Sequence, residues 1–144
     1  MRMSNFSKFM KQNKIEKENT TYAATKSLCD EGGNPLLWGI KPLSTKENDA
    51  IRDACTLDVQ VAGKPNVYRQ KLLTSKYIAK MICASVIEPN LNDKELQDSY
   101  GVMTPEDLLK EMVDDPGEYG DFAAFLQKLN GFTTLESDVD EAKN

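Results

Sequence analysis

Clusters of acidic residues are the groups in this sequence whose types and spacing come closest to a reactive site. One cluster comprises Asp114, Asp115, Glu118 and Asp121, and a second comprises Asp138, Asp140 and Glu141. A calcium loop needs oxygen ligands at fixed positions, a glycine at the sixth and a glutamate at the last, and neither cluster has that pattern. Paired carboxylates act as acid and base where a pocket separates their pKa values, so a small acidic enzyme is kept as a remote hypothesis.

Nucleophilic and metal chemistry have little support. The chain contains no histidine, so it lacks the usual Ser-His or Cys-His pair. Cys29, Cys55 and Cys83 are widely spaced and form no Cys-x-x-Cys motif, so we expect free thiols without a zinc site or disulfide framework. Gly32-Gly33 lacks the further glycine and lysine of a phosphate-binding loop and indicates a turn. We therefore predict a protein that is not an enzyme and holds no cofactor or metal.

The length and charge of the chain limit the classes of protein to which it can belong. A chain of 144 residues fits one domain, and its net charge of −5 is unevenly distributed. Basic residues dominate up to Leu28, and acidic residues dominate from Glu111 onward. This distribution differs from the clustered basic face of a nucleic-acid binder. The two ends are either simply solvated or bind different partners.

The apolar residues near the start do not form a signal peptide. Ser7, Lys8 and Lys11 interrupt them, and no run in the chain approaches the roughly 20 apolar residues that span a bilayer. We therefore expect a cytoplasmic protein that does not bind membranes.

The first 19 residues are predicted to form a flexible or amphipathic arm. Met3, Phe6, Phe9 and Met10 recur at near-helical spacing, which predicts a short helix over 3–12 with Ser4 as its cap. Residues 13–19 are polar and resemble a linker. The arm either docks on the core as a frayed terminus or offers Phe6 and Phe9 to a partner.

Residues 20–132 are predicted to form the single domain. Two β-hairpins are expected, one over 20–40 with a turn at 30–35 and a more exposed one over 57–72. A helix from 45 to about 55 separates them, begun by a capping box of Ser44 and Glu47, with Ala50, Ile51, Ala54 and Cys55 as its buried stripe.

The second half of the chain is predicted to be helical. A central helix over about 75–88, capped by Thr74 and stopped by Pro89, is apolar on nearly all sides and therefore buried. Three helices follow, over 94–98, from 105 with Thr104 as its cap, and over about 117–130. Residues 133–144 are acidic and predicted to be disordered. The expected fold is α+β and mainly helical, with N-terminal β-hairpins separated by a helix, then a C-terminal helical cluster around the buried central helix.

The stretch 89–103, Pro-Asn-Leu-Asn-Asp-Lys-Glu-Leu-Gln-Asp-Ser-Tyr-Gly-Val-Met, resembles the XkdN-like family of phage tail assembly chaperones. The part from Leu96 to Gly101 is its most specific segment. Weaker matches follow the family's order at 38–43, 53–56, 76–80, 106–112, 116–119 and 129–132. The resemblance covers most of residues 20–144. Within the stretch, the motif residues expected to shape the fold are Leu91, Leu96, Asp98, Tyr100 and Gly101.

The resemblance implies a non-catalytic assembly factor of contractile tails, defective prophages or tail-derived bacteriocins. Such chaperones bind the tape measure protein in the host cytoplasm before the tail tube forms, and they are absent from the finished particle. Many are made in two lengths by a programmed frameshift, and Ala142-Lys143-Asn144 is compatible with the slippery heptamer A-AAA-AAC. Further candidate partners are the tail tube protein, a longer frameshifted form and a second copy of the chain. The alternative is a structural tail adaptor or terminator retained in the particle.

A partner surface is expected on the last two helices together with the arm, because amphipathic helices accept a helical partner in a groove. Its candidate residues are Phe6, Phe9, Leu109, Met112, Phe122, Phe125 and Phe132. The alternative is that these side chains fill the core, which applies most to Phe122 and Phe125.

Overall fold

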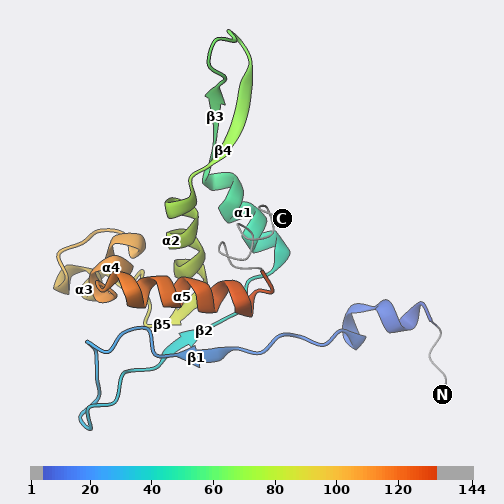
Figure 1. Ribbon diagram of the computed structural model, residues 1–144. Helices are drawn as coiled ribbons and strands as arrows, with labels where there is room; N and C mark the ends of the chain where they lie inside the picture. The colour runs from blue at the N-terminus through green and yellow to red at the C-terminus, as the bar shows by residue number, and fades with distance from the viewer. Residues whose placement is uncertain (1–4, 133–144) are drawn as a thin grey trace, which may run out of the picture.

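The computed structural model describes residues 5–132. Within these residues, five α-helices, two short 3-10 helices and five strands make an α+β fold (Figure 1). Their order is η1 (Ser7–Phe9), η2 (Lys11–Asn13), β1 (Thr20–Tyr22), β2 (Trp38–Ile40), α1 (Thr45–Ala54), β3 (Thr56–Gln60), β4 (Tyr68–Leu72), α2 (Thr74–Ser85), β5 (Val86–Glu88), α3 (Lys94–Ser99), α4 (Pro105–Met112) and α5 (Pro116–Leu129).

Three short antiparallel strands form one sheet, in the order β1-β2-β5. β1 pairs with β2 from Thr20 opposite Ile40 to Tyr22 opposite Trp38, the pairing expected for the first hairpin. At the far end of that hairpin, one carboxylate oxygen of Asp30 accepts the amides of Gly32 and Asn34, both at 2.9 Å. The predicted turn therefore forms, but a long irregular connection separates it from the paired strands.

The central helix is shorter than predicted. α2 ends at Ser85, and Val86–Glu88 forms β5, which pairs with the second edge of β2. The amide of Lys41 donates to the carbonyl of Ser85 at 2.8 Å and extends this ladder. Val86 and Ile87 are β-branched, and Pro89 disfavours a helical conformation at Glu88, so pairing with the open edge of β2 replaces a further helical turn. The predicted cap was also wrong, because Leu73 holds the N-cap position and makes no side-chain capping bond.

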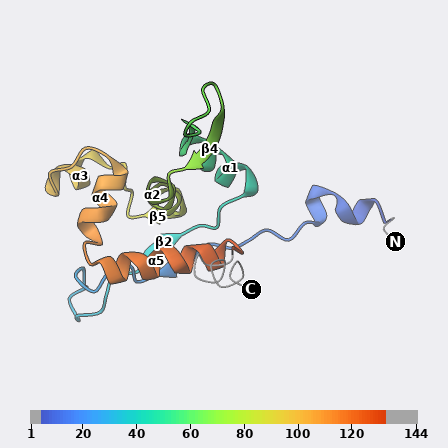
Figure 2. The same cartoon turned by 45° about the horizontal axis from the view of Figure 1, so that its top comes forward.

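The second hairpin, β3 with β4, stands out from the body as an antiparallel ribbon (Figures 1 and 2). Its register runs from Thr56 opposite Leu72 to Gln60 opposite Tyr68. A backbone bond from Leu73 N to the carbonyl of Cys55, at 2.8 Å, closes its base between α1 and α2. The predicted exposure of this hairpin is confirmed, since β3 and β4 contain no buried residue.

α1 begins with the predicted capping box but does not bury the predicted stripe. Ala50 and Ala54 are exposed, Ile51 is half-buried, and the buried residue is Cys55, which follows the helix. The reason is that the body of the protein lies against only one narrow side of α1. The two alanines, although apolar, have no neighbouring element to cover them.

The core lies where α2 and α5 meet the three-stranded sheet. Phe122 of α5 packs between the sheet residues Tyr22, whose ring stacks on it at 5.1 Å between centroids, and Trp38, whose ring meets it edge-on at 5.7 Å. On α2, Met81 and Ile82 are fully buried. α2 also contacts α1 and α4, so the helices gather around it.

The arm, residues 5–19, does not form the helix predicted over 3–12. Its described part contains two 3-10 turns, η1 and η2, and then an extended segment that leads to β1. The arm extends away from the body in both views (Figures 1 and 2), and Phe6 and Phe9 are 76% and 87% exposed. The expectation that the arm docks on the core is therefore wrong, because no apolar surface of the body covers these rings.

Candidate interaction site

A groove of about 620 Å³ lies between the base of the arm and the body, and we call it the arm groove. One wall is the arm itself, with Lys11, Lys14, Ile15 and Lys17. The other wall is the connection from β2 to α1, residues 41–45. Asn130 and Phe132, at the end of α5, also line the groove. Three segments far apart in the sequence therefore contribute to one cavity.

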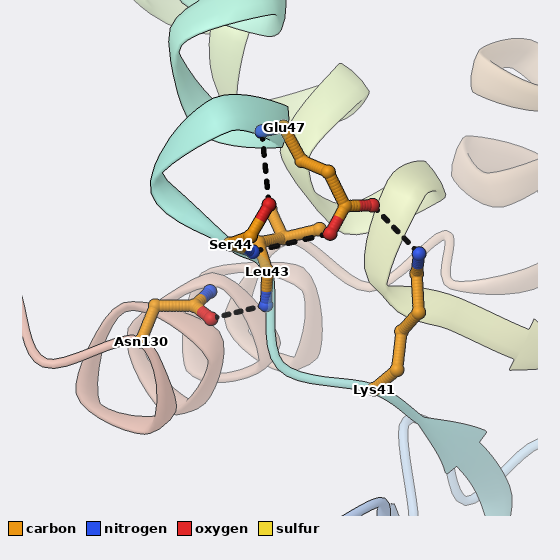
Figure 3. Close-up of polar contacts among 5 residues, drawn as sticks. All are labelled: Lys41, Leu43, Ser44, Glu47 and Asn130. Atoms are coloured by element: carbon orange, nitrogen blue, oxygen red, sulfur yellow. Dashed lines mark hydrogen bonds and ion pairs between the residues drawn. The ribbon is translucent and has the colours of Figure 1, made fainter. Parts of the chain in front are cut away.

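Polar contacts hold the body wall of the arm groove in place (Figure 3). The side-chain oxygen of Asn130 accepts the amide of Leu43 at 2.7 Å, which ties the end of α5 to the β2–α1 connection. Ser44 Oγ accepts the amide of Glu47, and the Glu47 carboxylate accepts the amide of Ser44, both at 3.1 Å. These reciprocal bonds satisfy two amides that the start of a helix leaves unpaired.

Glu47 also forms an ion pair on this wall. Its second carboxylate oxygen lies 2.7 Å from Lys41 Nζ. The hydrogen bond from Lys41, followed by the backbone bond from Ser44, lowers the pKa of the Glu47 carboxyl. The charge of Lys41 is therefore largely neutralised within the wall.

The end of α5 places Phe132 at the rim of the arm groove. Gly131 has φ +80, its amide donates to Lys128 O at 3.0 Å, and the amide of Phe132 donates to Gln127 O at 2.8 Å. This pair of bonds is a Schellman motif, which terminates a helix and redirects the chain. Phe132 stays 40% exposed as a result.

The predicted partner-binding residues divide into two groups in the structure. Leu109, Met112 and Phe122 lie in the core and do not line a surface of the folded chain, because they pack against the sheet and α2. Phe125 is half-buried and stacks on Tyr22 at 4.3 Å. Phe6 and Phe9 on the arm and Phe132 at the groove rim are the exposed members.

Sequence reasoning missed Ile15, which is 92% exposed and lines the arm groove. It was placed within a polar linker over 13–19. The sequence feature that could have identified Ile15 is that it is the one apolar residue in that stretch. Phe6, Phe9 and Met10 are also exposed, so the arm carries four large apolar side chains in solvent.

The motif stretch 89–103 forms a connector away from the arm groove. Asp93 caps α3 by accepting the amide of Leu96 at 2.9 Å, and Gln97 Nε2 donates to Leu91 O at 2.8 Å. Gly101, with φ +70, ends α3 in a second Schellman motif. Its amide donates to Asp98 O, and Val102 N donates to Gln97 O, both at 3.1 Å.

The remaining motif residues support this geometry. Leu91 is buried, while Leu96 and Tyr100 are half-buried against the core. Asp98 contributes its backbone carbonyl, and its side chain is exposed. The motif residues therefore set how α3 ends and how the chain enters α4.

In the first acidic cluster, Glu118 has a structural role. Glu118 accepts Thr25 Oγ1 with one carboxylate oxygen and Lys26 N with the other, both at 2.7 Å, and so pins the segment after β1 to α5. Among residues 5–132, no three His, Cys, Asp or Glu side chains gather closely enough to hold a metal ion. Asp138, Asp140 and Glu141, together with the whole predicted tail, lie outside the described residues.

The three cysteines differ in their surroundings. Cys29 is exposed, Cys55 is buried and Cys83 is half-buried, and all three are free thiols. Burial, with a smaller contribution from Glu106, raises the pKa of the Cys83 thiol to about 12, so it stays protonated at neutral pH. No helix within the described part of the chain combines the length and apolar content needed to cross a membrane.

Comparison with known proteins identifies the family. The model of the phage XkdN-like tail assembly chaperone proteins matches residues 6–143. The phage-like element PBSX protein XkdN of Bacillus subtilis (strain 168) is 28% identical over 137 residues, covering 94% of this chain and 91% of that protein. The uncharacterized protein YqbN of the same strain is 26% identical over 134 residues, covering 93% and 89%.

A solved structure agrees with the fold. The crystal structure of the protein YqbN superimposes with a TM-score of 0.73 at 20% identity, covering 92% of this chain and 100% of that one. Because the family match extends over residues 6–143, it includes most of the arm, which precedes the motif segments that carry the resemblance. This chain belongs to the XkdN-like family of phage tail assembly chaperones.

Proposed function

We propose that this chain binds the tape measure protein, keeps it soluble and promotes assembly of the tail tube around it, without catalysis. Membership of a tail assembly chaperone family supports the assembly role. The arm carries the choice of surface, because Phe6, Phe9 and Ile15 are 76%, 87% and 92% exposed and Ile15 also lines the arm groove.

The physical reason is that the exposed arm side chains favour burial by a partner. Burying one such side chain contributes about 1.5–3 kcal/mol. A tape measure protein is long and helical, and an amphipathic helix presents apolar side chains along one stripe. Such a stripe laid along the arm, with Phe132 at the groove rim, covers apolar surfaces on both partners and prevents the client from aggregating.

The cellular setting follows from this proposal. The complex forms in the host bacterial cytoplasm during assembly of a contractile tail, and the chaperone is absent from the mature particle. The tail tube protein, a longer frameshifted form and a second copy of this chain are further proposed partners. Sequencing the gene tests the longer form, which requires a slippery heptamer at Ala142-Lys143-Asn144 and an open −1 frame beyond it.

Co-expression with the tape measure protein tests the surface. Changing Phe6 and Phe9 to serine is expected to lower the soluble fraction of the tape measure protein severalfold, because the arm then loses both aromatic rings and offers only Met10 and Ile15. Met103→Ser is the matched control, since Met103 is 90% exposed but lies between α3 and α4, outside the arm groove. An unchanged soluble fraction with the serine variant would refute the arm as the binding surface.

Mass spectrometry of purified particles tests whether this chain is absent from the finished particle. We expect this chain to be absent or far below the abundance of tail proteins. Stoichiometric presence would overturn the chaperone proposal in favour of a structural adaptor or terminator.

A further inference from the structure

The arm groove is positively charged on its arm wall. Lys11, Lys14 and Lys17 line it from the arm, and all three are exposed. None of them forms a salt bridge with another described residue, and Glu16 is the single acid on this wall. On the body wall, Lys41 is already paired with Glu47. The unpaired charges in the groove are therefore those of the three arm lysines and Glu16, which are positive overall.

The chain leaves the described region directly at this groove. Phe132 lines it, and the Schellman motif at Gly131 fixes the direction in which the backbone departs from α5. The twelve residues of the segment 133–144 reach about 40 Å when extended, at roughly 3.3–3.6 Å per residue. The seven positions from Lys11 to Lys17 span at most about 25 Å by the same measure. The segment is therefore long enough to follow the whole arm wall.

The segment 133–144 is complementary to the groove in charge. Its sequence is Thr-Thr-Leu-Glu-Ser-Asp-Val-Asp-Glu-Ala-Lys-Asn, in which the acids Glu136, Asp138, Asp140 and Glu141 stand against Lys143. Leu135 and Val139 alternate with these acids, and the groove offers Ile15 and Leu43 as apolar neighbours. From these observations we propose that the acidic segment 133–144 binds in the arm groove of its own chain.

A polar atom of Asn130, which lines the groove, supports an occupant that accepts hydrogen bonds. The oxygen of the Asn130 amide is engaged by Leu43, whereas its nitrogen is buried and has no partner among residues 5–132 (Figure 3). A buried donor without an acceptor is costly. A carbonyl or carboxylate of the neighbouring segment is a suitable acceptor.

The chain's own segment is favoured over an acidic peptide from another protein because it is tethered at Phe132. A short covalent connection gives an effective concentration in the millimolar range, so weak exposed ion pairs suffice for occupancy. Such pairs are screened by salt, since the Debye length falls from about 10 Å at 0.1 M to about 3 Å at 1 M. The inference concerns a contact within the chain in the absence of a client, so its test is independent of the proposed function.

Zero-length carbodiimide cross-linking of the full chain tests the proposal. An equal mixture of ¹⁵N-labelled and unlabelled chains distinguishes links within one chain from links between chains. We expect isotopically pure links from Lys11, Lys14 or Lys17 to the acids of 133–144, reduced about tenfold or more in 1 M salt. The hairpin lysines Lys64 and Lys71 are the matched control, because they are equally exposed but lie outside the groove.

Neutralising the segment provides a second measurement. The variant E136Q/D138N/D140N/E141Q is expected to lose the cross-links and to shift the backbone amide resonances of Ile15 and Leu43. Links of mixed isotope content would overturn the proposal by placing the segment on a second copy. Equal linking to Lys64 and Lys71, or no links together with unchanged amide resonances, would overturn it as well.

Discussion

Glu47 illustrates how one side chain links several parts of the arm groove. It closes the capping box of α1 with Ser44 and forms an ion pair with Lys41, the residue that follows β2. The capping box is readable in the sequence because Ser and Glu stand three residues apart at a helix start. The ion pair is not, because only the folded path of the chain brings Lys41 to the same carboxylate.

Replacing Glu47 with glutamine tests the ionic part of this role. The pKa of Glu47 is lowered from its ordinary value of 4.5 by Lys41 first and Ser44 second, so its charged form stabilises the fold. This stabilisation is complete above the unfolded pKa of 4.5 and is lost as the pH falls through the lower pKa of the folded state. Because the pair is exposed, Glu47→Gln should lower the unfolding free energy by only about 0.2–1 kcal/mol at pH 7.

Urea unfolding at several pH values measures this difference. The gap between the native protein and Glu47→Gln should close as the pH falls below 4.5. Glu111→Gln is the control, since Glu111 is exposed and forms no salt bridge with a described residue. A gap that stays constant with pH would contradict an ionic role for Glu47.

At the scale of elements, the ends of helices were more predictable than their extents. Caps depend on residues next to one another, so Ser44 and Thr104 cap α1 and α4 as predicted, although Thr74 does not cap α2. The boundary at Ser85 depends instead on an open edge of β2, which comes from a distant part of the chain. The predicted helix over 75–88 failed there because β-strand pairing competed with helix continuation.

Gly101→Ala tests the turn that ends α3. An added Cβ meets no atom within 4 Å, so its cost comes from the backbone, whose φ of +70 is unfavourable for alanine by about 1–2 kcal/mol. Gly120→Ala is the matched control, because Gly120 lies within α5 in equally open space without a positive φ. We expect Gly120→Ala to stabilise the protein by about 0.5–1 kcal/mol. Equal effects of the two variants in thermal unfolding would contradict the role assigned to Gly101.

At the scale of the whole molecule, Phe122 connects the helical part to the sheet. Its ring contacts Tyr22 and Trp38, which lie on adjacent strands, while its helix packs on α2. The core therefore needs the first hairpin and the last helix to be present together. The arm and the β3–β4 ribbon extend outside this unit (Figure 1).

Phe122→Ala should destabilise the protein by about 3–5 kcal/mol, through lost burial and the cavity left behind. Phe9→Ala, the same substitution at an 87% exposed ring, should change stability by less than about 0.5 kcal/mol. The midpoints of urea unfolding measure both effects. A large loss of stability in Phe9→Ala would show that the arm belongs to the folding unit.

The sequence by itself determined the α+β class, the caps of α1 and α4, the two hairpins and the family. These features depend on local spacing of side chains, which the chain carries whatever its tertiary path. It also predicted Phe6 and Phe9 as candidates for partner binding, since two rings in a polar arm stand out.

Only the tertiary structure decided which apolar side chains are accessible. Leu109, Met112 and Phe122 share helix faces that suit a partner or a core equally well, and the packing of α5 on the sheet and α2 places them in the core. The arm groove likewise joins the arm, the β2–α1 connection and the end of α5. The spacing of residues along the chain does not show which distant segments become neighbours, because those contacts depend on how all the elements pack together.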